Sequence, residues 1–210
     1  ETMWLSAVSA LAAIHQTPSA EFQFLAHGAL VQSKKATSGL QQELIVWDDY
    51  RAWNGVPLTG IQERTRRWLE DHCPAATGPE ERLTGLAWGD ARLPNMVFRS
   101  NRCQAVIDWE TVSLAGAETD LAWWLFFDWY MTEGSGITRL EGLPDREGFL
   151  GTWKQLVGRQ PQNMEWHEVF AIYRYSMIRD RALMLFGQQR PDDFETIDPA
   201  LQRLAMMISD

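Results

Sequence analysis

The stretch LAWGDARLPNMVF, residues 86–98, and the stretch VIDWE, residues 106–110, decide the fold and point to its chemistry. Two short β-like runs, Met96–Phe98 and Gln104–Ile107, flank a polar turn at residues 99–102. Apolar runs of this length on either side of a turn predict an antiparallel β-hairpin. The open ends of a hairpin lie together, so the residues that enter and leave it are expected to converge.

Three residues with oxygen-bearing side chains stand at that open end. Asp90 lies in the loop before the hairpin, Asn95 lies five residues later and Asp108 thirteen residues after that. Amide and carboxylate oxygens suit Mg²⁺, which keeps several waters. Phosphoryl transfer needs a carboxylate that orients the accepting hydroxyl and takes its proton, plus an Asn and an Asp that hold Mg²⁺ against the phosphates. Each residue alone is equally typical of a turn, and the combined spacing favours a site.

Arg92 lies on the same loop, two residues after Asp90. Its permanent charge could neutralise charge that develops on a transferred phosphoryl group. We therefore predict Asp90 and Arg92 as catalytic residues and Asn95 and Asp108 as ligands of Mg²⁺.

Composition excludes several classes of protein. Nineteen basic and 28 acidic residues give a net charge of −9, which argues against binding of a nucleic acid polymer. The longest apolar run has seven residues, 121–127, whereas a membrane span needs about 20. The start of the sequence carries no secretory pattern. Cys73 and Cys103 are expected to be ordinary thiols, so we expect a cytoplasmic protein.

Helical periodicity dominates the rest of the chain. Apolar residues spaced three or four apart predict helices at 3–15, 39–53, 59–72, 118–131, 145–157, 165–186 and 199–208. Residues 23–38 are ambiguous, and residues 74–84 and 134–144 are predicted loops. Thr59, with Gln62 three residues later, predicts a capping box at the third helix. The fold class is therefore mainly α, with one small central hairpin.

The residues that converge on the hairpin also carry a family resemblance. Asp90-x-x-x-x-Asn95 followed by Ile107-Asp108-Trp109-Glu110 resembles the aminoglycoside phosphotransferase-like kinases, the phosphotransferase enzyme family. Residues 115–122, AGAETDLA, are similar to that family's next element. The branch that it resembles most is the kinase domain associated with acyl-CoA dehydrogenases. This resemblance implies a protein-kinase-like fold, the cofactors ATP and Mg²⁺, and transfer of the γ-phosphoryl group to a small-molecule hydroxyl.

One further position departs from the family pattern, and another matches it. Trp88 stands where the family usually has a histidine that supports the loop. Asp120 matches a family residue that stabilises the catalytic loop through backbone contacts. The resemblance therefore implies a structural role for Asp120.

The resemblance also implies a second lobe that binds nucleotide, with a β-sheet and a lysine that grips ATP. No segment of residues 1–210 matches it, and Lys34 and Lys35 lie outside any apolar strand. We therefore expect residues 1–210 to be the C-terminal lobe, with the nucleotide-binding lobe packing on it. The C-terminal lobe alone is expected to be inactive.

The acceptor pocket is expected between the catalytic loop and the C-terminal helices, and its candidate residues are Trp109, Glu110, Tyr173 and Arg179. Tyr173 has the equally ordinary interpretation of core packing. Two other functions stay open. The chain could be a catalytically silent kinase-like module that binds a ligand or partner, or an unrelated metal-dependent phosphohydrolase that uses Asp90 and Asp108.

Overall fold

The computed structural model describes residues 2–27, 39–74 and 85–209. The expected helices are confirmed as α1 Thr2–His15, α2 Gly39–Asn54, α3 Gly60–Asp71, α4 Ala117–Tyr130, α5 Arg146–Val157, α6 Met164–Leu185 and α8 Pro199–Met207. Short elements that periodicity did not predict are η1 Ser19–His27, η2 Leu93–Asn95, η3 Glu133–Ser135 and α7 Phe194–Ile197. Of the ambiguous stretch 23–38, residues 28–38 lie outside the described residues, as do residues 75–84 of the predicted loop.

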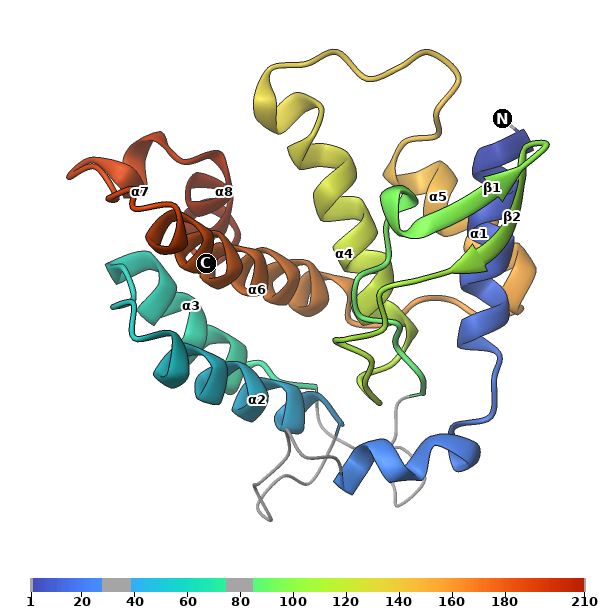
Figure 1. Ribbon diagram of the computed structural model, residues 1–210, viewed down its shortest axis with the longest axis horizontal. Coiled ribbons are helices and arrows are strands. Elements are labelled where there is room, and N and C mark those ends of the chain that lie inside the picture. The colour runs from blue at the N-terminus through green and yellow to red at the C-terminus, as the bar shows by residue number, and fades with distance from the viewer. Residues whose placement is uncertain (1, 28–38, 75–84, 210) are drawn as a thin grey trace.

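The helices form two groups that meet at α4 and α6. In Figure 1, α2 and α3 lie along α6 on one side, while the hairpin lies against α1 on the other side. Helix α1 packs on α5 and on the second strand, and α4 packs on α6. The loop that leads into the hairpin therefore lies near the junction of the two groups (Figure 1).

The predicted hairpin is confirmed, with slightly different bounds. Strand β1, Met96–Arg99, pairs antiparallel with β2, Arg102–Val106, and Met96 lies opposite Val106. The turn residues Ser100 and Asn101 have φ values of 50° and 61°. Two successive left-handed residues match the twist of the strands that they connect. The tight turn sets the pairing next to it, Phe98 with Cys103, and a β-bulge between Val97 and Phe98 then shifts the register by one residue, so that Met96 lies opposite Val106 at the open end.

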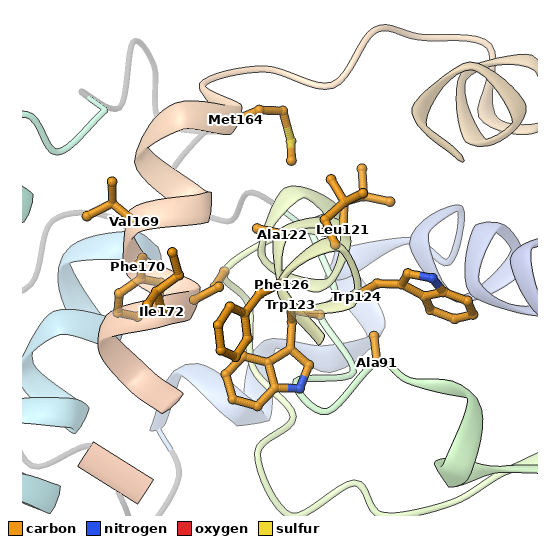
Figure 2. Close-up of a cluster of buried hydrophobic side chains, with 14 of the residues drawn as sticks. Ala91, Leu121, Ala122, Trp123, Trp124, Phe126, Met164, Val169, Phe170 and Ile172 are labelled. Atoms are coloured by element: carbon orange, nitrogen blue, oxygen red, sulfur yellow. The ribbon is translucent and has the colours of Figure 1, made fainter. Parts of the chain in front are cut away.

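Helix α4 is the centre of the core. Its first ten residues, 117–126, are all buried, so a helix with no polar face is stable here because neighbours cover it on every side. Figure 2 shows Trp123 and Trp124 leaving α4 in different directions. Trp124 stacks on Phe149 of α5, with ring centroids 5.3 Å apart. Each buried aromatic side chain contributes roughly 1.5–3 kcal/mol, so α4 ties α5 and α6 together.

Three smaller expectations can also be compared with the structure. The capping box of α3 is confirmed, because Thr59 and Gln62 exchange side-chain and backbone hydrogen bonds. Cys73 and Cys103 are free thiols. Within residues 2–27, 39–74 and 85–209, no helix combines the length and apolar character that crossing a membrane requires.

Candidate active site

The loop that carries Asp90 is anchored at the N-terminus of α4. The Asp120 carboxylate accepts hydrogen bonds from the backbone N–H groups of Trp88 and Gly89, both at 2.7 Å. It also accepts one from His15 Nε2 at 2.9 Å. A buried carboxylate is satisfied by such donors and by the positive end of the helix dipole. These contacts agree with the structural role that the family resemblance implies for Asp120.

His15 extends this anchor to α1 and α5. Its Nδ1 accepts a hydrogen bond from the indole N–H of Trp153 at 2.9 Å. An imidazole nitrogen that accepts carries no hydrogen, so the hydrogen lies on Nε2, which faces Asp120. A single tautomer thus satisfies both partners and connects three helices to the loop.

Asp90 itself is held by three donors from three directions. Trp123 Nε1 of α4 donates to Asp90 Oδ1 at 2.6 Å. Asn95 Nδ2 donates to Asp90 Oδ2, and Arg92 Nε lies 2.9 Å from Oδ1. The Asp90 side chain is 15% exposed, so the carboxylate is fixed by donors but open to solvent on one side. The structure therefore brings Asp90, Arg92 and Asn95 together.

Asp108 joins this group through the backbone. Ile107 N–H donates to the Asn95 carbonyl at 3.0 Å, which aligns the two ends of the hairpin. Asp108 itself has φ +63° and is exposed. Non-glycine residues seldom adopt this conformation, although Asp tolerates it better than most. The geometry re-aims the chain immediately after β2 and leaves the Asp108 side chain facing solvent.

Trp88 supplies the support expected of the usual histidine. Its side chain is fully buried, and its indole N–H lies 2.9 Å from the carbonyl of Ile107 and 3.1 Å from that of Asp108. A buried indole N–H normally finds such an acceptor. Trp88 therefore links the Asp90 loop to the backbone around Asp108.

The donor set fits a hard cation only in part. The described residues contain no group of three or more His, Cys, Asp or Glu side chains that could hold a metal ion. The Asn95 amide nitrogen donates to the carbonyl and to the carboxylate of Asp90. The oxygen of the same amide is therefore the atom of Asn95 that could bind a cation. One amide oxygen and one exposed carboxylate, that of Asp108, suit Mg²⁺, because this ion keeps several waters or phosphate oxygens as ligands.

The remaining predicted residues separate into two pairs. Trp109 and Glu110 follow Asp108 and are exposed, and the Trp109 indole donates to the Val106 carbonyl at 3.0 Å. In the sequence they directly follow Asp108, at the end of the hairpin.

Tyr173 and Arg179 lie elsewhere. Tyr173 is 0% exposed, and burial raises its pKa to about 12. Arg179 pairs with Asp180 and Asp198 and stacks over Phe194 at 4.4 Å. Tyr173 therefore does not reach solvent, and Arg179 is held by partners at α7 and α8.

Tyr50 and Arg181 are two residues that sequence reasoning missed. Burial raises the pKa of Tyr50 of α2, the charge of Glu110 raises it further, and Arg181 of α6 opposes this shift. The guanidinium of Arg181 lies 4.5 Å from the ring of Trp53. Nothing in the sequence pairs α2 with residue 110.

A cavity of about 250 Å³ lies on another side of α4. Trp129, Glu168 and Arg203 are among its lining residues. Neither Asp90 nor Asp108 lines it, so the cavity is separate from the candidate site.

Comparisons with known proteins identify the family and the fold of the chain. A profile of the phosphotransferase enzyme family matches residues 1–162. The chain belongs to the phosphotransferase enzyme family. It is 31% identical over 113 residues to mouse acyl-CoA dehydrogenase family member 11. It also superposes, with a TM-score of 0.72 and 19% identity, on a Ralstonia eutropha crystal structure described as a candidate aminoglycoside phosphotransferase.

The matches differ in how much of each protein they cover. The mouse match spans 50% of this chain and 14% of the mouse protein. The structural match spans 99% of this chain and 65% of the Ralstonia chain. The resemblance and the protein-kinase-like fold expected from the sequence are thereby confirmed. Membership of the phosphotransferase enzyme family supports a kinase-like function.

Proposed function

We propose that this protein is an ATP-dependent phosphotransferase that transfers the γ-phosphoryl group of ATP to a hydroxyl of a small molecule. The observation that carries the proposal is the Asp90 carboxylate, which three donors hold in one orientation while one side stays open. A carboxylate held in this way can orient an acceptor hydroxyl and take its proton. Arg92 would stabilise charge on the transferred group.

The Asn95 amide oxygen and the Asp108 carboxylate would hold Mg²⁺. The ion would bind the phosphates of ATP and neutralise their charge. A nucleotide-binding lobe is part of this proposal, because residues 1–210 would be the C-terminal lobe and the other lobe would pack on it. Residues 1–210 alone would then be inactive.

The acceptor would bind between two walls on the open side of Asp90. Trp109 and Glu110 would form one wall, and Tyr50 and Arg181 would form the other. Tyr173 is excluded from this pocket because it is fully buried, and Arg179 would contribute only from the α7 and α8 side.

A catalytically silent module is the second candidate. The loss of the usual histidine at Trp88 favours it, because a damaged loop would abolish transfer. The Trp88 indole, however, donates to the carbonyls of Ile107 and Asp108, so the loop keeps a support at this position. This observation favours the enzyme over the silent module.

An ATP-consumption screen tests the proposal in protein that carries the nucleotide-binding lobe. Release of ADP is measured with Mg²⁺ and separate panels of sugars, aminoglycosides, amino alcohols and hydroxyacyl thioesters. At least one panel should raise ADP release above the rate without acceptor, with one phosphate appearing on the acceptor. ADP release that no hydroxyl compound accelerates would favour the silent module.

The first variant for that assay is Asp90→Asn. The amide keeps the shape but loses the charge and the proton-accepting role, so turnover should fall about 10²–10⁴-fold. The affinity for Mg·ATP should stay nearly unchanged. Glu147→Gln, an exposed acid on α5, is the control and should keep full turnover. If Asp90→Asn kept nearly the turnover of the unmodified protein, Asp90 would have no catalytic role.

A further inference from the structure

A buried arginine lies beneath the loop that carries Asp90. Arg174 of α6 is 2% exposed, and its Nη2 donates to the carbonyl of Gly89 at 3.1 Å. Its guanidinium lies 4.9 Å from the ring of Trp47 and 4.6 Å from the ring of Trp123. Arg174 therefore touches both the residue before Asp90 and the indole that donates to Asp90.

The surroundings of Arg174 are not those of an optimised ion pair. Burial lowers its pKa, and Glu43, Asp120 and Asp90 only partly oppose that shift. Arg174 Nε has no hydrogen-bond partner in the described part of the chain. Burying a guanidinium is costly unless its donors are satisfied. Stabilisation of the fold alone therefore does not explain why a guanidinium with an unpaired Nε is buried at this position.

Trp123 is the rigid member among the donors to Asp90. It is 3% exposed, its backbone belongs to the core helix α4, and its indole N–H reaches Asp90 Oδ1 at 2.6 Å. Arg92, in contrast, is 36% exposed and has a long side chain that can reorient. A cation over the face of an indole is attracted to its π electrons and draws density from the ring, which strengthens the N–H as a donor.

We propose that Trp123 is a positioning residue for Asp90, and that Arg174 holds Trp123 and Gly89 in register for this purpose. With Oδ1 bound by Trp123 and Oδ2 by Asn95, the carboxylate plane cannot rotate. This inference rests on the proposed function in so far as Asp90 is the group that receives the acceptor hydroxyl.

Nuclear magnetic resonance of the indole N–H groups tests the contact without any turnover. The chain of 210 residues is labelled with ¹⁵N, and Trp123→Phe identifies the Trp123 signal as the one that disappears. Asp90→Asn should move that signal upfield, because an amide oxygen is a weaker acceptor than a carboxylate. The Trp166 indole donates to the Leu69 carbonyl and should not move. A Trp123 signal that stays in place in Asp90→Asn overturns the proposal.

Kinetics in protein that carries the nucleotide-binding lobe test the positioning role. Trp123→Phe keeps an aromatic ring but removes the donor, so kcat should fall about 10- to 100-fold with an unchanged KM for ATP. Trp166→Phe, which removes a buried donor near the start of α6 that binds the Leu69 carbonyl, should keep both constants. Thermal unfolding of each variant identifies a loss that comes from misfolding.

A double-mutant cycle separates positioning from general support. If Trp123 acts through Asp90, Trp123→Phe should cost nothing further in the Asp90→Asn background. Fully additive losses overturn the proposal. If no hydroxyl compound is phosphorylated by the unmodified protein, the proposed function fails, and the indole spectrum alone then decides whether Trp123 fixes Asp90.

Discussion

Gly89 shows how closely the two loops of the candidate site approach each other. Its φ is +96°, and a Cβ at this position would lie 2.2 Å from the carbonyl oxygen of Thr111. A side chain would therefore need both an unfavourable backbone conformation and a displaced neighbouring segment. Only glycine fits where the Asp90 loop passes the segment after Asp108.

Gly89→Ala should consequently destabilise the fold. We expect a loss of about 1–3 kcal/mol in the free energy of unfolding from backbone strain, measured by urea denaturation. Gly151→Ala in α5 is the matched control, because a Cβ added there would have no neighbouring side chain or segment within 4 Å. That control should gain about 0.5–1 kcal/mol. Equal stability of the two variants would contradict the close approach at Gly89.

Asp108 should respond differently from Asp90 to the same substitution. In Asp108→Asn a proposed metal ligand loses its charge, so the apparent affinity for Mg·ATP should weaken together with kcat. Binding is measured by titration with Mg·ATP in protein that carries the nucleotide-binding lobe. Unchanged nucleotide affinity in Asp108→Asn would place the metal elsewhere.

Helix α6 illustrates what the sequence could not predict at the scale of an element. It runs for 22 residues, and most of residues 164–177 are buried, so no apolar stripe indicates which side faces the site. Tyr173 and Tyr175 differ by about 200° around the helix. Tyr173 is buried, whereas Tyr175 packs against Phe127, the ring under the guanidinium of Arg92.

The hairpin, in contrast, could be predicted from local sequence. Its strands and turn lie within eleven residues, so short-range pairing brings the backbone of Asn95 next to Ile107, the residue before Asp108. The contacts of Trp123 and Arg174 with the Asp90 loop join residues more than 30 and more than 80 positions apart. Packing of whole helices brings these residues together, and a single sequence does not reveal it.

The hairpin turn offers a stabilising substitution. Asn101 has φ +61°, a conformation that glycine adopts without a steric penalty. Asn101→Gly should therefore raise the free energy of unfolding by up to about 1 kcal/mol, seen as a higher melting temperature. Ala105→Gly in β2 is the control and should lower it, because Ala105 is paired with Val97 and glycine weakens a strand interior. A lower melting temperature for Asn101→Gly would contradict this turn geometry.

The stability of the whole molecule should depend on pH through His167. This side chain is buried between α6 and α4, and burial lowers its pKa to about 4. The unfolded chain takes up a proton near pH 6.5, so stability should fall as the pH drops from about 6.5 towards 4. The full loss is on the order of 3 kcal/mol.

Urea denaturation at pH 7 and at pH 5 measures this dependence. The unmodified protein should lose about 2 kcal/mol over that interval. His167→Gln removes the buried imidazole and should lose clearly less, whatever its stability at pH 7. An identical loss in both proteins would assign the pH dependence to other groups.

The segment from residue 85 to residue 116 leaves and re-enters the helical body at one place. Ala87 and Ser113 exchange two backbone hydrogen bonds, and Gly116 N–H donates to the Gly85 carbonyl at 3.0 Å. Every group proposed to perform the transfer chemistry lies between these two points. The segment is thus a loop inserted between helices and closed at its base by these hydrogen bonds. The entropic cost of closing such a loop rises only slowly with its length. Insertions at the hairpin tip, residues 100–101, would therefore leave the hydrogen bonds at the base of the segment intact.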